Sequence, residues 1–260
     1  MRIVLLTLLL ATTAGPAIAK SKRVPAVATA MSASPLRSAI AAPGRPVEAV
    51  ALDAARKPAD VLAFAGLKPG ARVLDILTGT GYYAEVMARV VGPQGSVTAF
   101  APGGYNKAKT DAAFAAIASR QPIVRLVNDP MQVFGTADAF DFAMINLNYH
   151  DFYWESVQYG IPRTDPNTVL GGLFHAMKPG GIVAVVDHVG PAGDTRAIVD
   201  KLHRIDPATV KADFARAGFV LDGESNILRN TGDDHTKLVF DPAIRGKTDQ
   251  MVLRFKKPAK

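Results

Sequence analysis

The sequence of 260 residues contains no cysteine, so its fold cannot depend on a disulfide bond. That absence is compatible with an oxidising compartment, and it excludes a lipoprotein whose lipid is attached to a cysteine. The sequence also lacks an apolar run of the ~20 residues that a membrane-spanning helix needs. A permanent membrane anchor is therefore not expected.

One short apolar run does occur, at the amino-terminal end. It extends from Ile3 to Ala11, follows the positive Arg2, and is broken by Gly15-Pro16. Ala17-Ile18-Ala19 then provides small residues at the two positions that a signal peptidase reads. We expect residues 1–19 to be a signal peptide, the mature protein to be periplasmic or secreted, and no stable membrane insertion to remain after cleavage.

Negative charge is missing from the first 47 residues. Six of the 30 basic residues precede Glu48 but no acidic residue does, which leaves 24 basic and 23 acidic residues in the remainder. A folded nucleic-acid-binding domain carries its basic excess on the domain itself, so we expect no nucleic-acid partner. Residues 20–46 are rich in Ala, Ser and Pro without an apolar period, which predicts a flexible arm before a single domain of residues 47–260.

From residue 47 onward, segments typical of strands and of helices alternate. Short apolar runs predict strands, and apolar residues at helical spacing predict the helices between them. Because the last two strands follow each other directly, we predict an α/β fold: a Rossmann-like three-layer sandwich whose seven-stranded, mostly parallel sheet has an antiparallel C-terminal strand. Strands are expected at residues 72–77, 96–100, 123–127, 140–147, 182–187, 219–227 and 248–255, and helices at 47–56, 58–65, 82–91, 108–118, 166–177 and 207–217.

The first predicted strand leads into a turn that contains two glycines. Asp75 lies near the end of this strand, and Gly79 and Gly81 follow before the next helix. Glycines let a backbone turn tightly and approach a ligand closely. In open α/β sheets ligands bind beyond the carboxyl ends of the strands, where the next helix offers free N–H groups. The segment from Asp75 to Gly81 therefore predicts a ligand-binding crevice.

This turn resembles the first motif of the class I S-adenosylmethionine (SAM)-dependent methyltransferases, in which an acidic residue precedes alternating glycines. The polar cluster at residues 146–151 and the turn at residues 177–181 are similar to features of the same family. The resemblance covers residues 58–257 and implies a SAM-dependent methyltransferase that methylates oxygen or nitrogen of an unidentified small molecule. The residues predicted to bind the cofactor SAM are Asp75, Thr78, Gly79, Gly81, Tyr82 and Asn146.

A further similarity is to an exported branch of predicted methyltransferases. It depends on several short segments taken together, because each alone is a weak signal. These segments are residues 56–58, 81–83, 148–151, 186–188, 202–206 and 246–249.

The chain departs from the family motif at two places. Leu77 stands where the motif has its first glycine, and it would bring a branched side chain to the edge of the cofactor. The second strand ends at Phe100 and is followed by Ala101-Pro102, without the acid that would hold the ribose hydroxyls as a bidentate acceptor. Both departures predict weaker SAM binding.

Histidine and aspartate lie side by side after the fourth and fifth predicted strands. A histidine titrates near neutrality and can take a proton from a hydroxyl that accepts the methyl group. The sequence from Asn146 to Tyr149 also resembles the Asn-Pro-Pro-Tyr of amino-methylating enzymes, without its two prolines. The predicted catalytic residues are His150, Asp151, Tyr149 and His188.

Two other functions fit the same residues. One is a catalytically inactive relative that binds a small ligand in the crevice. The other is a metal-assisted hydrolase, since imidazole and carboxylate groups at separate strand ends suit Zn²⁺ or Mn²⁺. No metal ligand is assigned, because Asp206 before Pro207 fits a helix N-cap better than a metal site. The sequence does not determine the oligomeric state.

Overall fold

The computed structural model describes residues 33–102, 107–130 and 133–259, and within these ranges seven strands form one sheet. The strand order is β3-β2-β1-β4-β5-β7-β6. Neighbouring strands from β3 to β5 are parallel, whereas β7 is antiparallel to both β5 and β6. The predicted fold class is therefore confirmed. The strands are β1 (Arg72–Ile76), β2 (Ser96–Phe100), β3 (Val124–Val127), β4 (Phe140–Asn146), β5 (Met177–His188), β6 (Val220–Ser225) and β7 (Gln250–Lys256).

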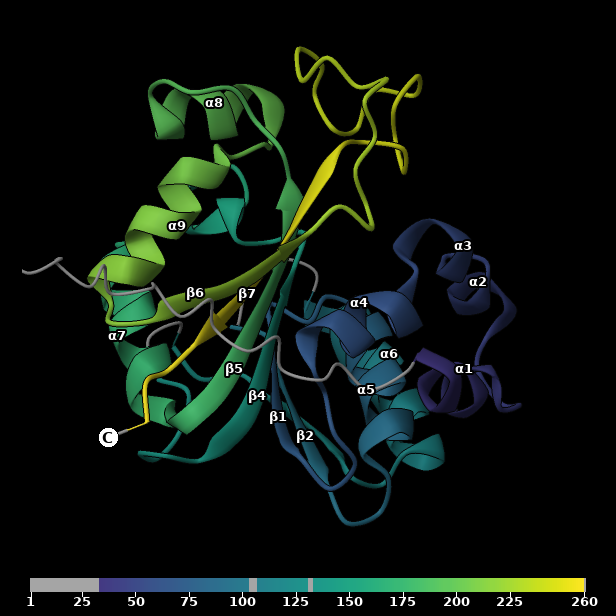
Figure 1. The fold of residues 1–260 in the computed structure, drawn as a ribbon. Helices are drawn as coiled ribbons and strands as arrows, with labels where there is room; N and C mark the ends of the chain where they lie inside the picture. The colour runs from purple at the N-terminus through teal and green to yellow at the C-terminus, as the bar shows by residue number, and fades with distance from the viewer. Residues whose placement is uncertain (1–32, 103–106, 131–132, 260) are drawn as a thin grey trace, which may run out of the picture.

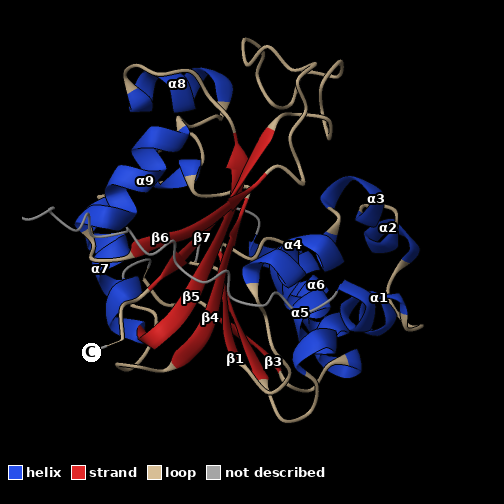
Figure 2. Ribbon diagram, viewed as in Figure 1, coloured by secondary structure: helices blue, strands red, loops and turns tan. Residues whose placement is uncertain are grey.

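Helices cover the sheet in two layers. Figures 1 and 2 show α1 to α6 on one side of the sheet and α7 to α9 on the other. Each layer packs its own apolar cluster against the central strands. This follows because buried parallel strands carry apolar side chains on both faces of the sheet. The helices are α1 (Ala33–Ala41), α2 (Val47–Val50), α3 (Asp53–Arg56), α4 (Pro58–Ala65), α5 (Tyr82–Val91), α6 (Lys107–Arg120), α7 (Pro166–Ala176), α8 (Thr195–Leu202) and α9 (Pro207–Arg216), with the 3₁₀ helix η1 (His150–Tyr153) after β4.

The expected flexible arm needs a correction. Its residues 33–41 form helix α1, which packs against α4 and α5. Leu36 and Ile40 are almost completely buried in the apolar cluster of that layer, and their burial stabilises the helix. The expected signal peptide and residues 20–32 lie outside the described residues.

Other boundaries differ from the predicted ones. Residues 47–56 form two short helices instead of one, and β5 begins at Met177, five residues before its predicted start. Helix α8 was not predicted, because only Val199 and Leu202 of its residues are buried and so short a segment shows little periodicity. The predicted N-cap is confirmed, since the Asp206 carboxylate accepts a hydrogen bond from the backbone N–H of Ala208 at 2.8 Å.

The carboxyl ends of β1, β4 and β5 lie at the same edge of the sheet. Ile76 pairs with Ile145, and Asn146 pairs with Val186, so the residues that follow these strands are neighbours in space. Within the described ranges, no helix combines the length and the apolar character that crossing a bilayer requires.

Candidate functional site

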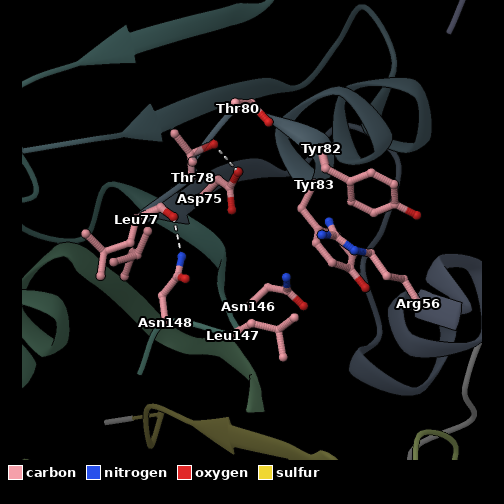
Figure 3. Close-up of a pocket in the computed structure, with 12 residues that line it drawn as sticks. Arg56, Asp75, Leu77, Thr78, Thr80, Tyr82, Tyr83, Asn146, Leu147 and Asn148 are labelled. Carbon is pink, nitrogen blue, oxygen red and sulfur yellow. Dashed lines mark hydrogen bonds between the residues drawn. The ribbon is translucent and has the colours of Figure 1, made fainter. Parts of the chain in front are cut away.

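A cavity of about 220 Å³ lies where the turn after β1 meets the start of α5 and the residues after β4. Figure 3 shows the side chains around it. Four of the six residues predicted to bind the cofactor line the cavity through the β1 turn and helix α5, and Asn146 does so from the end of β4. The residues that line the cavity are Arg56, Asp75, Ile76, Leu77, Thr78, Gly79, Thr80, Tyr82, Tyr83, Asn146, Leu147 and Asn148.

The turn is formed by three residues in the left-handed backbone region. Leu77, Gly79 and Gly81 have φ values of 52°, 59° and 83°. A Cβ atom added to Gly79 would meet nothing within 4 Å, whereas one added to Gly81 would lie 2.4 Å from Ile117 Cδ1. Gly79 therefore lines the cavity with open space beside its Cα atom. Gly81, the sixth predicted residue, does not line the cavity, and its lack of a side chain lets α6 pack closely.

Leu77 adopts the backbone conformation that a glycine would take at this position of the motif. Its side chain packs against the apolar cluster under α7 and α9, and Figure 3 shows it directed away from Tyr83 and Arg56. The amide nitrogen of Asn148 donates a hydrogen bond to the Leu77 carbonyl. The cavity thus stays open beside Leu77.

Among the described residues, Asp75 is the one carboxyl group that lines the cavity, and it is 2% exposed. Its carboxylate accepts hydrogen bonds from the Thr78 hydroxyl, at 2.5 Å, and from the backbone N–H of Ala84. Burial nevertheless raises the pKa of Asp75 to about 7. A cation bound beside Asp75 would favour its ionised form.

Arg56 and Tyr83 bring to the cavity polar groups that have no ion-pair or hydrogen-bond partner within the described part of the chain. The Arg56 guanidinium lies 4.3 Å from the ring centroid of Tyr82 and, among the described residues, forms no ion pair. The Tyr83 hydroxyl is buried without a hydrogen-bond partner. By contrast, the Tyr82 hydroxyl donates to Asp53 at 2.7 Å. A buried hydroxyl without a partner is costly, so a polar ligand group here would satisfy it.

Sequence reasoning did not assign Arg56, Tyr83 or Asn148 to the site. The only signal for Arg56 was its place in a segment shared with the exported branch. Tyr82 and Tyr83 are adjacent, and only the structure shows that the hydroxyl of Tyr83 is the one left without a partner.

The four predicted catalytic residues do not line this cavity. Tyr149 is completely buried, and its hydroxyl donates to Asp213 at 2.8 Å, in the apolar cluster on the α7–α9 side. At that position Tyr149 cannot contact a ligand in the cavity. Since Asn148 lines the cavity and His150 follows two residues later, the two sites are neighbours along the chain.

His150 lies in a buried network at the ends of β4 and β5. Its Nδ1 is 2.8 Å from Asp187 Oδ1, and its backbone N–H donates to Asp187 Oδ2. On the other side of the ring, Nε2 is 3.4 Å from Asp151 Oδ1. Burial by itself lowers the pKa of His150, but the carboxylates of Asp187 and Asp151 outweigh it and raise the pKa to about 9.

Two further histidines surround His150. His188 places its Nδ1 2.7 Å from the Thr248 hydroxyl, and burial lowers the pKa of His188 to about 4. His203 ends α8 with its ring centroid 5.5 Å from that of His150, and burial likewise lowers its pKa to about 4. Asp187 was visible in the sequence only as the neighbour of His188, and its contact with His150 depends on the pairing of β4 with β5.

Parts of the chain are similar in sequence to known methyltransferases. Residues 48–102, which include the turn after β1, match the family described as Protein-L-isoaspartate(D-aspartate) O-methyltransferase (PCMT). The 2-phytyl-1,4-naphtoquinone methyltransferase of Synechococcus elongatus is 32% identical over 123 residues, which are 46% of this chain and 47% of the relative. The ubiquinone/menaquinone biosynthesis C-methyltransferase UbiE of Serratia proteamaculans is 27% identical over 140 residues, which are 48% of this chain and 46% of the relative. The chain thus spans about half the length of the curated relatives it matches.

Solved structures resemble nearly the whole chain. A SAM-dependent methyltransferase from Aquifex aeolicus has a TM-score of 0.58 at 17% identity, covering 87% of this chain and 99% of the other. The chain has the class I SAM-dependent methyltransferase fold. A second structure with the same fold is the 1,6-didemethyltoxoflavin-N1-methyltransferase of Burkholderia thailandensis, solved with 1,6-didemethyltoxoflavin and S-adenosylhomocysteine. Its TM-score is 0.52 at 18% identity, and the match covers 84% of this chain and 92% of the other. In a methyltransferase fold, the cavity after β1 lies at the sheet edge where open α/β sheets bind their ligands.

Proposed function

We propose that this chain is a SAM-dependent methyltransferase that acts on oxygen or nitrogen of a small molecule. The observation that carries the proposal is the cavity at the β1–α5 turn, which Gly79 lines beside Asp75, its one buried carboxyl group among the described residues. The likeness of residues 48–102 to the PCMT family, and of about half the chain to quinone methyltransferases, supports it.

The groups around the cavity fit the chemistry of SAM. SAM carries an ammonium and a carboxylate on its amino-acid end, beside a positive sulfonium. Asp75 is suited to the cationic groups. The Arg56 guanidinium and the Tyr83 hydroxyl, which has no hydrogen-bond partner among the described residues, are suited to the carboxylate. When bound, SAM supplies an electrophilic methyl group. The protein's own contribution is to hold and orient the two reactants.

The methyl acceptor is proposed only as a class. The names of the two curated relatives refer to a naphthoquinone and to ubiquinone/menaquinone biosynthesis, and one of them is a C-methyltransferase. We therefore include quinones and their hydroxylated precursors among the acceptors to be tested. The catalytic roles of His150, Asp151 and His188 stay predictions, and Tyr149 is left out because it is buried against Asp213. Export by a signal peptide at residues 1–19 also stays a proposal.

A second candidate function is a catalytically inactive protein that binds another ligand in the same cavity. The sequence after β2 favours this candidate, because Phe100 is followed by Ala101 and Pro102 and not by the acid that would hold the ribose hydroxyls of SAM.

Calorimetric titration of the purified protein with SAM and with S-adenosylhomocysteine tests the proposal. We expect saturable binding of both at micromolar concentration, followed by transfer of label from methyl-labelled SAM to one acceptor of a panel of phenols, amines and quinones. No heat of binding at millimolar SAM would overturn the proposal in favour of the inactive candidate. SAM binding without transfer to any acceptor would keep the cofactor site and contradict the O- and N-acceptors tested.

A further inference from the structure

Three potential metal ligands converge beside η1, outside the cavity after β1. His150 Nε2, Asp151 Oδ1 and a ring nitrogen of His203 all lie within 4.8 Å of one another. Two come from η1 and the third from the end of α8, so elements separated by about 50 residues of chain meet here. The distance from Asp151 Oδ1 is 3.4 Å to His150 Nε2 and 3.9 Å to His203 Nδ1.

These separations are close to those of ligands that share one ion. With zinc–nitrogen and zinc–oxygen bonds of about 2.0–2.2 Å, two ligands of a tetrahedral zinc ion are about 3.4 Å apart. The pair Asp151 and His150 has this separation already. The pair Asp151 and His203 exceeds it by about 0.5 Å, and the ligand atoms of His150 and His203 lie within 4.8 Å of each other.

Asp187 holds His150 as an outer-sphere carboxylate holds a metal-binding histidine. One Asp187 oxygen contacts Nδ1 of the ring and the other accepts the backbone N–H of His150, both at 2.8 Å. Because Asp187 holds the proton on Nδ1, Nε2 is the nitrogen that gives up its proton to a metal ion, and it lies beside Asp151 and His203. Metal-binding histidines characteristically give their second nitrogen to such a partner.

His203 is kept near the other two ligands at a conformational cost. Its φ of 49° lies in the left-handed region, which few residues other than glycine and asparagine adopt. Its ring contacts those of Trp154 and Phe240, with centroid distances of 5.0 and 5.2 Å. Backbone strain of this kind persists only where the surrounding structure imposes it.

An ion from solvent can reach these atoms. The side chain of Asp151 is 33% exposed and that of His203 is 14% exposed, whereas His150 is 4% exposed. Three protein ligands leave a fourth tetrahedral position for water or a substrate atom. We propose that His150, Asp151 and His203 form a binding site for a divalent metal ion with an open position, with Zn²⁺ as the ion best suited to two imidazoles and one carboxylate.

The test is a metal titration of protein purified without a histidine tag and treated with a chelator. With Zn²⁺ added in competition with a chromophoric chelator, we expect one equivalent to bind. With Co²⁺ as a spectroscopic probe, we expect the visible absorption of a four-coordinate ion. A wild-type protein that shows no saturable binding of Zn²⁺ or Co²⁺ would overturn the proposal.

Variants distinguish this site from adventitious binding. His203→Asn keeps a residue that tolerates the left-handed conformation but removes the imidazole, and we expect it to weaken Zn²⁺ binding about 100-fold or more, as should Asp151→Asn. Asp187→Asn should weaken it by about 10–100-fold, because it disturbs only the orientation of His150. His175→Ala, in helix α7, is the matched control and should bind Zn²⁺ like the wild type. Equal affinities in the His203→Asn variant and the wild type would overturn the proposal.

Folding of the variants is checked separately from metal binding. Melting temperatures in excess chelator should be similar for the wild type and His203→Asn, and added Zn²⁺ should raise only that of the wild type, since a ligand stabilises the state that binds it. A similar rise for His203→Asn would contradict the site. The metal measurements require no SAM, so their result is independent of the proposed methyltransferase activity.

Discussion

The cavity after β1 and the histidine network after β4 and β5 lie at the same edge of the sheet but are built in opposite ways. The cavity is formed by the backbone conformation of the turn, with open space beside Gly79. Among the described residues the Tyr83 hydroxyl has no hydrogen-bond partner, and the Arg56 guanidinium contacts the Tyr82 ring but forms no ion pair. In the network, His150 and His188 each have a side-chain partner. The cavity thus offers polar groups to a ligand, whereas in the network the hydrogen bonds between side chains fix the positions of the histidine rings.

The largest effect is expected from closing the cavity. Gly79→Val would introduce a branched side chain into the space above the turn, and we expect SAM affinity to fall at least about 100-fold. Gly66→Val is the matched control, because Gly66 ends α4 with a φ of 79° and also has nothing within 4 Å of an added Cβ. Calorimetry of both variants checks this, and an equal loss of affinity in the control would mean that backbone strain, not the cavity, is responsible.

Two tyrosine-to-phenylalanine changes separate the two regions by stability. Tyr149→Phe leaves the buried Asp213 carboxylate with one hydroxyl donor fewer, and we expect a loss of about 1–3 kcal/mol in the free energy of unfolding. Tyr83→Phe removes a hydroxyl that has no partner, so stability should be unchanged or higher while SAM affinity falls. Urea denaturation measures both. A large loss of stability in Tyr83→Phe would show that its hydroxyl has a partner in solution.

Arg56→Ala should lower SAM affinity about 10-fold through loss of a charged partner for the carboxylate. Decarboxylated SAM lacks only that carboxylate, so its affinity should be the same for the variant and the wild type. Titration with both ligands checks this. An equal loss for the two ligands would assign Arg56 to another part of the cavity, through its contact with Tyr82.

The pH dependence of stability should differ between the wild type and Asp75→Asn. Because the pKa of Asp75 is about 7 in the folded protein and near 3.8 when exposed, the folded state holds a proton that the unfolded state releases between these values. The contribution of Asp75 to stability is therefore present at low pH and falls as pH rises from about 4 to 7. Chemical denaturation across that range should show the decline in the wild type and a weaker one in Asp75→Asn. Parallel profiles would contradict the raised pKa.

The smallest effect is expected at Leu77. Leu77→Gly removes a left-handed conformation that destabilises the folded state by about 1–2 kcal/mol. It also removes apolar contacts that stabilise the folded state by a similar amount. Since the side chain is directed away from Tyr83 and Arg56, we expect SAM affinity to change by less than about threefold. A gain well above this in calorimetry would show that Leu77 does obstruct the cofactor.

Much of the fold, but less of the site, could be predicted from the sequence. The apolar runs predicted all seven strands, because each central strand is buried on both faces. Residues 33–41 were expected to be flexible, since α1 buries only a few apolar side chains, among them Leu36 and Ile40, and so has a weak pattern. The residues of the β1 turn were found because they are contiguous in the sequence. Arg56 and the contact between Asp187 and His150 were missed because they depend on packing between separate elements.

The sequence by itself determined the seven strands, most of the helices between them, the tight turn with Gly79 and Gly81, and the place of the polar residues at strand ends. These features follow from local preferences and from the spacing of apolar residues, which act over short distances along the chain. Only the tertiary structure decided that Tyr149 is a core residue, that Tyr83 lacks a partner, and that His203 meets His150. The burial and the partners of a polar group are set by the packing of distant segments, and a linear pattern does not contain them.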